Sequence, residues 1–291
     1  MQLLVNTLIA GSFAAIMATG LALVYGVLRV FNLALGQFAL VGGYVTWWLV
    51  QPLGLPLPVG ILGGIVCGAL VSWLSFEIAV RPFYKRHPLL PLVSTIALSQ
   101  ILDGLIQLIF KEQTRSILIR AKEMVHLGSA VISMEQIKLI IFTVVLLSAT
   151  AWILHSTSIG RRIRATVAHS QAAESLGISS ALLHRLVFII SGTLAAIAGI
   201  YVGIDQNLTP VLGFTITIKA YAALIAGGKG NIWGAVIASY FIAAIEQLAV
   251  GIKWFGYYLP AGYQGSVALM LIIVLLLIKP TGLFGRTSRF A

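Results

Sequence analysis

The fold of this chain is decided by residues 3–28, which read LLVNTLIAGSFAAIMATGLALVYGVL. This stretch carries no charged side chain, and a helix needs about 20 mostly apolar residues to cross a bilayer. A secretory signal peptide starts with basic residues and has a shorter apolar core, whereas the first basic side chain here is Arg29. The sequence therefore predicts a retained membrane-spanning helix at this end.

The overall composition agrees with a membrane protein. Of 291 residues, 59% are hydrophobic and 9% are charged, and the mean hydropathy is +1.01. A soluble domain carries about 25% charged residues, so this chain has too few to cover a surface exposed to water. Disorder is excluded by the high apolar content. The single cysteine, Cys67, rules out an internal disulfide.

Uncharged apolar runs recur along the whole chain and predict its architecture. We expect an all-α polytopic membrane protein with eight to nine transmembrane helices, forming one transmembrane domain over residues 1–291. The candidate spans are 3–28, 30–50, 57–76, 89–110, 139–155, 186–204, 211–226, 232–252 and 259–278.

Two regions predict interrupted helices. The run 30–50 opens with the polar string Asn32–Gln37, so we expect its first third to be irregular. The runs 211–226 and 232–252 are separated only by Gly227–Asn231, and short apolar segments interrupted by glycine often mark broken helices near a transport path. The polar string either lines such a path or makes a bent contact between helices, because lone polar groups are costly in hydrocarbon.

The distribution of Lys and Arg predicts the orientation, because cytoplasmic loops are enriched in basic residues. If all nine runs cross, the N-terminus faces out and the C-terminus faces the cytoplasm. Twelve of the 19 basic residues then lie inside and Lys219 lies within a span. The remaining six lie outside: Lys111, Arg115, Arg120, Lys122, Lys138 and Lys253. One run that does not cross would reverse the N-terminal side.

Three ionisable residues fall inside predicted spans, namely Asp103, Lys219 and Glu246. A charge at mid-bilayer costs about 2.5–3.5 kcal/mol or more, so each must face protein or water. They form either a substrate or ion path or a structural ion-pair network.

Two segments outside the spans are long enough to matter. We expect the outer loop 111–138, which has mixed charge, to cap the outer mouth. The inner loop 156–185 predicts one basic helix at about 161–176, ended by Gly177 in the left-handed region. Its apolar face is thin, with only Ile163, Val167 and Leu176 as bulky members. Docking into a partner protein therefore explains it better than lying on lipid.

Motifs for catalysis and cofactor binding are missing from the sequence. There is no phosphate-binding loop, since Gly228-Lys229 is followed by Gly230, and no dinucleotide fingerprint. Metal-ligand spacings such as H-E-x-x-H and C-x-x-C are also missing. We expect no catalytic residue, metal or cofactor on this chain. The basic charge is accounted for by topology, so no nucleic-acid partner is expected.

Four stretches, taken in order, carry a family resemblance. They are Gly20–Gly26 running into Phe31–Gln37, then Ser158–Ile178, Lys219–Ala235 and Lys279–Arg286. Together they resemble the permeases of branched-chain amino acid ABC transporters of the LivH/LivM type, and more the LivH half. The resemblance covers essentially the whole chain.

This resemblance implies a membrane subunit of a bacterial importer in the cytoplasmic (inner) membrane. Its implied partners are two cytoplasmic ATP-binding subunits, a second permease subunit of the LivM kind, a periplasmic substrate-binding protein and membrane lipid. ATP hydrolysis would occur on a separate chain. The inner loop resembles a coupling helix, which maps onto Arg161, Arg162, Arg164, Ala172, Ala173, Glu174 and Gly177.

The expected substrate is not limited to branched-chain amino acids, because the stretch Phe31–Gln37 departs from the usual motif of the family. Leu35 and Gln37 stand where relatives usually have His and an acid, which removes polar groups from the expected path. The implied cargo is a branched-chain amino acid or a similar small solute such as urea, an amide or another amino acid. The predicted path residues are Asn32, Gly36, Gln37, Tyr44, Lys219 and Tyr221. The alternative is a stand-alone carrier coupled to an ion gradient.

Overall fold

The computed structural model describes residues 1–84, 86–87, 89–117, 124–127, 130–251, 253–254, 257–258, 260–279 and 281–284. Each of the nine apolar runs contains a helix, which confirms a polytopic helical membrane protein. These helices are α1 (Gln2–Leu28), α2 (Leu35–Val50), α3 (Leu57–Ser75), α4 (Leu89–Phe110), α5 (Met134–Ser156), α8 (Ser180–Asp205), α9 (Leu212–Gly227), α10 (Ile232–Gly251) and α11 (Gln264–Ile278).

The described helices differ in their ability to span a membrane. Six are long and apolar enough by themselves, including α1, α8 and α10, whereas α2 and α9 have only 16 residues each. A 16-residue helix rises about 24 Å, less than the ~30 Å hydrocarbon core. The short helices α2 and α9 therefore coincide with the two regions in which the sequence predicts an interruption; α11, with 15 residues, is also short.

The first interruption follows the end of α1. Arg29 has φ 54°, in the left-handed region, and closes α1 with a backbone hydrogen bond to the carbonyl of Tyr25. The chain then runs without helix until Leu35, where α2 begins. In between, the Asn32 side chain accepts a hydrogen bond from the Ala34 amide at 3.1 Å, so a local polar turn replaces the missing helical bonds.

Small residues bring α2, α3 and α8 into close contact. A Cβ on Gly64 of α3 would overlap Thr46 of α2, and one on Gly68 would overlap Ala196 of α8. Gly199 of α8 lies equally close to the backbone of Ala39 in α2. These glycines are packing seams, as expected where helices associate in lipid.

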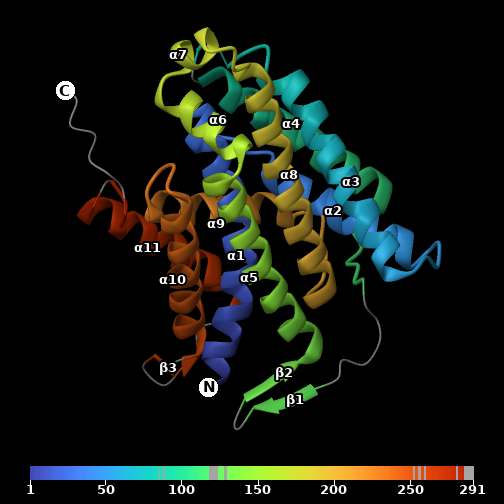
Figure 1. The fold of residues 1–291 in the computed structure, drawn as a ribbon. Helices are drawn as coiled ribbons and strands as arrows, with labels where there is room; N and C mark the ends of the chain where they lie inside the picture. Colours follow the sequence, from blue (N-terminus) through green and yellow to red (C-terminus); the bar gives the residue numbers. More distant parts are fainter. Residues whose placement is uncertain are drawn as a thin grey trace.

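Figure 1 shows the main helices side by side, with α1 and α8 in the middle of the bundle. The π-helical turn η1 (Phe76–Val80) extends α3, while α6 (Ser158–Ala168) and α7 (Ser170–Ser175) lie together at one end of the bundle. We call this the α6 end. The start of α1 lies at the opposite end, near the hairpins β1–β2 (Met124–Leu127, Ala130–Ser133) and β3–β4 (Lys253–Trp254, Tyr257–Tyr258). A 3-10 turn, η2 (Ala261–Tyr263), precedes α11.

The predicted outer loop 111–138 is shorter than expected. Residues 134–138 belong to α5, because Ser133 and Gln136 form a reciprocal capping box that starts the helix at Met134. Residues Arg120, Lys122 and Glu123 of this loop lie outside the described residues. Its first part is fixed to α8 and the segment after it, since Arg115 and Leu208 exchange backbone hydrogen bonds of 3.0 and 2.7 Å.

The prediction of one helix at 161–176 is wrong. The segment forms two helices, α6 and α7, separated at His169, whose φ of −153° is extended. As a result, the three bulky residues of the predicted apolar face do not lie on one face. Ile163 is buried, whereas Val167 is 41% and Leu176 is 82% exposed.

Candidate functional site

The two interrupted helices, α2 and α9, touch each other near their first turns. The Gly36 amide of α2 donates to the Thr217 hydroxyl of α9 at 2.9 Å, and that hydroxyl donates to the Gly213 carbonyl at 2.8 Å. A Cβ on Gly36 would overlap the same carbonyl. Gly36 therefore allows two interrupted helices to meet backbone to backbone, which is its role in this structure.

A polar contact inside the bundle joins α2 to α4. The side-chain amide of Gln37, which is fully buried, donates to both carboxylate oxygens of Asp103 at 3.2 Å. The sequence suggests each residue separately but not their contact, because they are 66 positions apart in the chain. Gln37 is uncharged at a motif position where an acid is usual. The Asp103 carboxylate, which comes from α4, lies against this position instead.

An ion pair joins α9 to α10. The Lys219 ammonium lies 2.9 and 3.0 Å from the two carboxylate oxygens of Glu246, whose side chain is 8% exposed. Both residues line a cavity of about 190 Å³ between α1, α8, α9 and α10, together with Gln206, Ser239 and Gln247. Lys219 and Glu246 therefore form the ion pair between helices that was one of the two sequence-based interpretations. The pair also borders a space large enough for water or a small solute.

Three further predicted path residues are packed among helices. Asn32 and Tyr44 are buried, and Tyr44 stacks on Phe110 of α4 with ring centroids 4.7 Å apart. The Tyr221 ring lies 5.8 Å from that of Phe31, in the segment before α2.

The six predicted path residues therefore do not form one cluster around an open space. Of the six, Lys219 alone lines the 190 Å³ cavity, and it points to α10. Gly36 and Gln37 lie instead at contacts of α2 with α9 and α4. Gly36, Gln37 and Lys219 all connect an interrupted helix to a neighbouring helix. Their role in a substrate path stays a prediction.

At the α6 end, α6 folds back sharply against α5. The Thr157 hydroxyl caps α6 by accepting from the Gly160 amide at 3.2 Å. A Cβ on Gly160 would overlap the carbonyl of Leu154, so only glycine allows this approach. The Arg164 guanidinium donates to the carbonyls of Leu154 and His155 at the end of α5. Buried Ile163 completes the attachment of α6 to the bundle.

The predicted coupling residues are mostly exposed on these two short helices. Arg161, Arg162, Arg164, Ala172 and Glu174 face solvent, and Ala173 is buried.

Gly177 ends α7 as the sequence predicts. Its φ is +80°, and two backbone bonds close the turn, from Gly177 to Glu174 and from Ile178 to Ala173, both 3.0 Å. This is a Schellman motif, which satisfies carbonyls at a helix end.

The stretches that carry the resemblance meet at the α6 end. The Leu283 amide donates to the Ala226 carbonyl at 2.7 Å, and Gly282 packs on Gly228. The turn after α9 also approaches α1, because a Cβ on Gly26 would lie 3.6 Å from the Cα of Gly230. Short motifs far apart in the sequence are thus parts of one region.

No group of three or more His, Cys, Asp and Glu is placed to hold a metal ion within the part of the chain that the structure describes.

Comparisons with known proteins agree along nearly the whole chain. The family model of the branched-chain amino acid transport system permease component matches residues 3–278. The permease LivH of Escherichia coli K12 is 29% identical, with 98% of this chain and 96% of LivH covered. The permease BraD of Pseudomonas aeruginosa is 31% identical, with the same coverage of each chain.

A solved structure supports the fold. A chain of PsaBC from Streptococcus pneumoniae superposes with a TM-score of 0.52 at 14% sequence identity, covering 97% of this chain and 93% of that one. At this identity the likeness concerns the fold alone. The family match, together with the two relatives, identifies the protein class: this chain belongs to the family of permease components of branched-chain amino acid transport systems.

Proposed function

We propose that this chain is a permease subunit of a bacterial binding-protein-dependent ABC importer. It would carry a branched-chain amino acid or a similar small solute across the cytoplasmic (inner) membrane. The observation that carries the proposal is the family match over residues 3–278, which includes both interrupted helices and the α6–α7 region. ATP would be hydrolysed by two partner subunits on the cytoplasmic side.

The proposed orientation places the α6 end in the cytoplasm. It puts Arg29, Arg81, Arg86, Lys229 and the three arginines of α6 on that side, in agreement with the positive-inside rule. The opposite end, where the segment after α4 is bound to α8, would face the substrate-binding protein.

The α6–α7 region supports a coupling role because α6 is attached to the bundle while the end of α7 is exposed. Gly160, Ile163 and Arg164 attach α6 to the end of α5. At the end of α7, the Leu176 side chain is 82% exposed and is therefore accessible to a partner protein. Movement of an ATP-binding subunit would therefore be transmitted through α6 to the spans.

The cargo is proposed from the relatives, since LivH and BraD are named as branched-chain amino acid permeases. A second permease subunit of the LivM kind would complete the path. Within this chain, the Lys219–Glu246 pair borders the 190 Å³ cavity and is the charged pair that a zwitterionic solute in that cavity would meet.

Reconstituted uptake tests the proposal. The chain, its sister permease and the ATP-binding subunits are placed in vesicles, and uptake of labelled leucine is measured. Uptake should require both ATP and the soluble binding protein. Uptake by the chain alone, driven by a proton or sodium gradient, would instead support an ion-coupled carrier and overturn the proposal.

The coupling role has its own test. Replacing Glu174 by Gln and Gly177 by Ala should uncouple or release the ATP-binding subunits while membrane insertion stays normal. A matched control combines Glu135→Gln with Gly104→Ala, since a Cβ on Gly104 meets nothing within 4 Å. Transport at the unmodified rate in the Glu174/Gly177 variant would contradict this role.

A further inference from the structure

A row of polar residues lies on the exposed side of α4. Gln100, Asp103 and Gln107 follow one another at spacings of three and four residues, so they share one face of the helix. Gln100 and Gln107 are exposed, and Asp103 is partly exposed. The buried residues Thr95 and Ile106 lie on a different side, where α4 packs against α2 and η1. We call Gln100, Asp103 and Gln107 the polar face of α4.

The polar face extends to the middle of the span. Gln100 stands midway between Leu89 and Phe110, the two ends of α4. At 1.5 Å per residue it lies about 15 Å from each helix end, and Asp103 lies about 10 Å from Phe110. The Gln100 side chain is too short to reach the bilayer surface from this depth. If this face met the membrane, hydrocarbon would therefore surround its polar atoms.

The other exposed surfaces at this depth are apolar. On α3, Val66 and Leu70 are exposed, and α4 itself has an exposed apolar row of Ile101, Leu105 and Leu108. Such rows suit the acyl chains of lipids. An exposed amide or carboxylate in hydrocarbon is costly, because nothing there replaces its hydrogen bonds to water. The polar face of α4 must therefore meet water or protein.

The Asp103 carboxylate favours water or a polar solute over a packed helix. It accepts from the Gln37 amide at 3.2 Å on each oxygen, and no Lys or Arg of the described residues lies within salt-bridge distance of it. One neutral donor leaves most of the acceptor capacity of a carboxylate unused. A helix packed onto this face would have to bring a cation, whereas water or an ammonium group satisfies the carboxylate directly.

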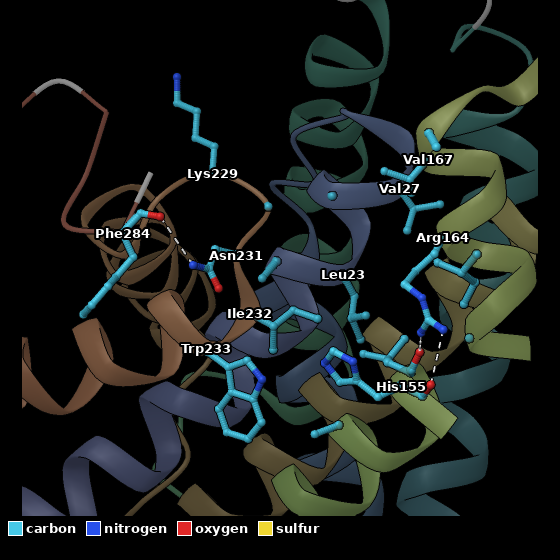
Figure 2. A pocket seen from close by; sticks show the side chains of 18 residues that line it. Leu23, Val27, His155, Arg164, Val167, Lys229, Asn231, Ile232, Trp233 and Phe284 are labelled. Atoms are coloured by element: carbon cyan, nitrogen blue, oxygen red, sulfur yellow. Dashed lines mark hydrogen bonds between the residues drawn. The ribbon is translucent and has the colours of Figure 1, made fainter. Parts of the chain in front are cut away.

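The cavities inside the chain do not offer a carboxylate of this kind. In the 190 Å³ cavity, Glu246 is already paired with Lys219. A larger cavity of about 620 Å³ opens at the α6 end, and its lining is mostly apolar and contains no Asp or Glu. Figure 2 shows Lys229 directed away from that space and Arg164 turned onto the carbonyls at the end of α5.

We propose that the polar face of α4 forms one wall of the solute path and that the Asp103 carboxylate binds the ammonium group of an amino acid there. The amides of Gln100 and Gln107, about one turn to either side, are donors for the carboxylate of the solute. An amino acid supplies the cation that Asp103 lacks, whereas urea or an uncharged amide does not. This inference rests on the proposed function and assigns residues that contact its solute; the second permease subunit would form the opposite wall.

Thiol labelling tests whether the polar face meets water. Cys67 is replaced by Ala, and either Gln100→Cys or Ile101→Cys is added. The complex with the sister permease and the ATP-binding subunits is reconstituted in vesicles and treated with a charged methanethiosulfonate reagent. Only the thiolate reacts, and it does not form in hydrocarbon, so modification should be about tenfold faster at position 100 than at position 101. Ile101 is the matched control, because it is adjacent in depth and 60% exposed.

The amino acid is tested in the same complex. Leucine in excess should slow the modification at position 100 by about twofold, because a bound solute covers the site. In uptake measurements, Asp103→Asn should raise the KM for leucine about tenfold with a smaller change in the maximal rate, because a charge-assisted bond is lost. Asp103→Glu keeps the charge and should retain most of the affinity. Unfolding temperatures of both variants show whether the contact with Gln37 has been weakened.

The results that would overturn the proposal are specific. Equally slow modification at positions 100 and 101 would show that lipid or a partner helix covers the face. Fast modification that leucine does not slow would show water without an amino acid site. Lower stability of Asp103→Asn with an unchanged KM would show that Asp103 only joins α4 to α2. If the unmodified complex takes up no leucine, the proposed function fails, but the labelling comparison needs no uptake and still decides whether the face meets water.

Discussion

Gly36 of α2 and Gly213 of α9 lie in backbone contact inside the membrane-spanning bundle, 177 positions apart in the chain. A Cβ on Gly36 would overlap the Gly213 carbonyl, and the Gly36 amide is already bonded to Thr217 on the next turn of α9. The two interrupted helices are therefore held together by a contact that no larger residue can make.

Gly36→Ala should destabilise the protein by about 1–3 kcal/mol, because a backbone carbonyl cannot move aside as a flexible side chain can. Thermal unfolding of the purified chain in mild detergent measures the change. Gly104→Ala on the exposed face of α4 is the control, and it should be neutral or stabilise the protein by up to about 1 kcal/mol. Equal effects of the two substitutions would show that α2 and α9 are not in contact.

Lys219→Met should destabilise the protein by about 3–5 kcal/mol, because it leaves the Glu246 carboxylate buried without a partner. The double variant Lys219→Met with Glu246→Leu should recover most of this loss, since it removes both charges. A double-mutant cycle on unfolding measures the coupling. Additive effects of the two substitutions would be inconsistent with the ion pair.

Transport by the same double variant separates a structural pair from a path group. If Lys219 only fixes α9 to α10, the stable double variant should carry solute at a rate near that of the unmodified protein. If the 190 Å³ cavity is part of the path, uptake should fall about tenfold or more although stability recovers. Unchanged folding and unchanged transport in Lys219→Met would refute both roles.

Exchange of the amide and carboxylate between Gln37 and Asp103 tests their contact. Gln37→Glu alone should destabilise the protein by about 1–3 kcal/mol, because it places two carboxyl groups together and removes the donor. Adding Asp103→Asn restores one amide and one carboxylate and should recover stability. The measurement is the unfolding midpoint of the single and of the double variant. If the double variant is no more stable than Gln37→Glu alone, the result would count against the contact.

Gly160→Ala should weaken the attachment of α6 to α5, because the added methyl group overlaps the Leu154 carbonyl. We expect ATP-driven uptake to fall at least about tenfold while the amount of inserted protein changes little. Ala165→Ser, on the exposed face of the same helix, is the control and should transport normally. Normal uptake in Gly160→Ala would show that the position of α6 does not matter for coupling.

Sequence reasoning located the helices well and their interruptions almost as well. Long apolar runs leave few alternatives in a bilayer, where the backbone must satisfy its own hydrogen bonds. The polar string after Arg29 and the glycines at 227–230 predicted the breaks, because their side chains or conformations do not suit a continuous helix. The single inner helix was wrong, since the extended backbone at His169 has no signal in the apolar pattern.

Contacts between helices were beyond prediction from the pattern alone. The sequence identified Asp103, Lys219 and Glu246 as intramembrane charges but left open which partner each one has. It also placed Asn32, Gly36, Gln37 and Tyr44 in one group, while the structure distributes them over different helix contacts.

The sequence by itself determined that this chain is a bundle of membrane helices with two interruptions and a helix stop at Gly177, because these depend on local composition and backbone preference. Only the tertiary structure decided that Gln37 meets Asp103, that Lys219 meets Glu246, and that distant motif stretches meet at the α6 end. Such pairings depend on how helices far apart in the chain cross, and that is set by small residues such as Gly36 and Gly160 that let backbones approach.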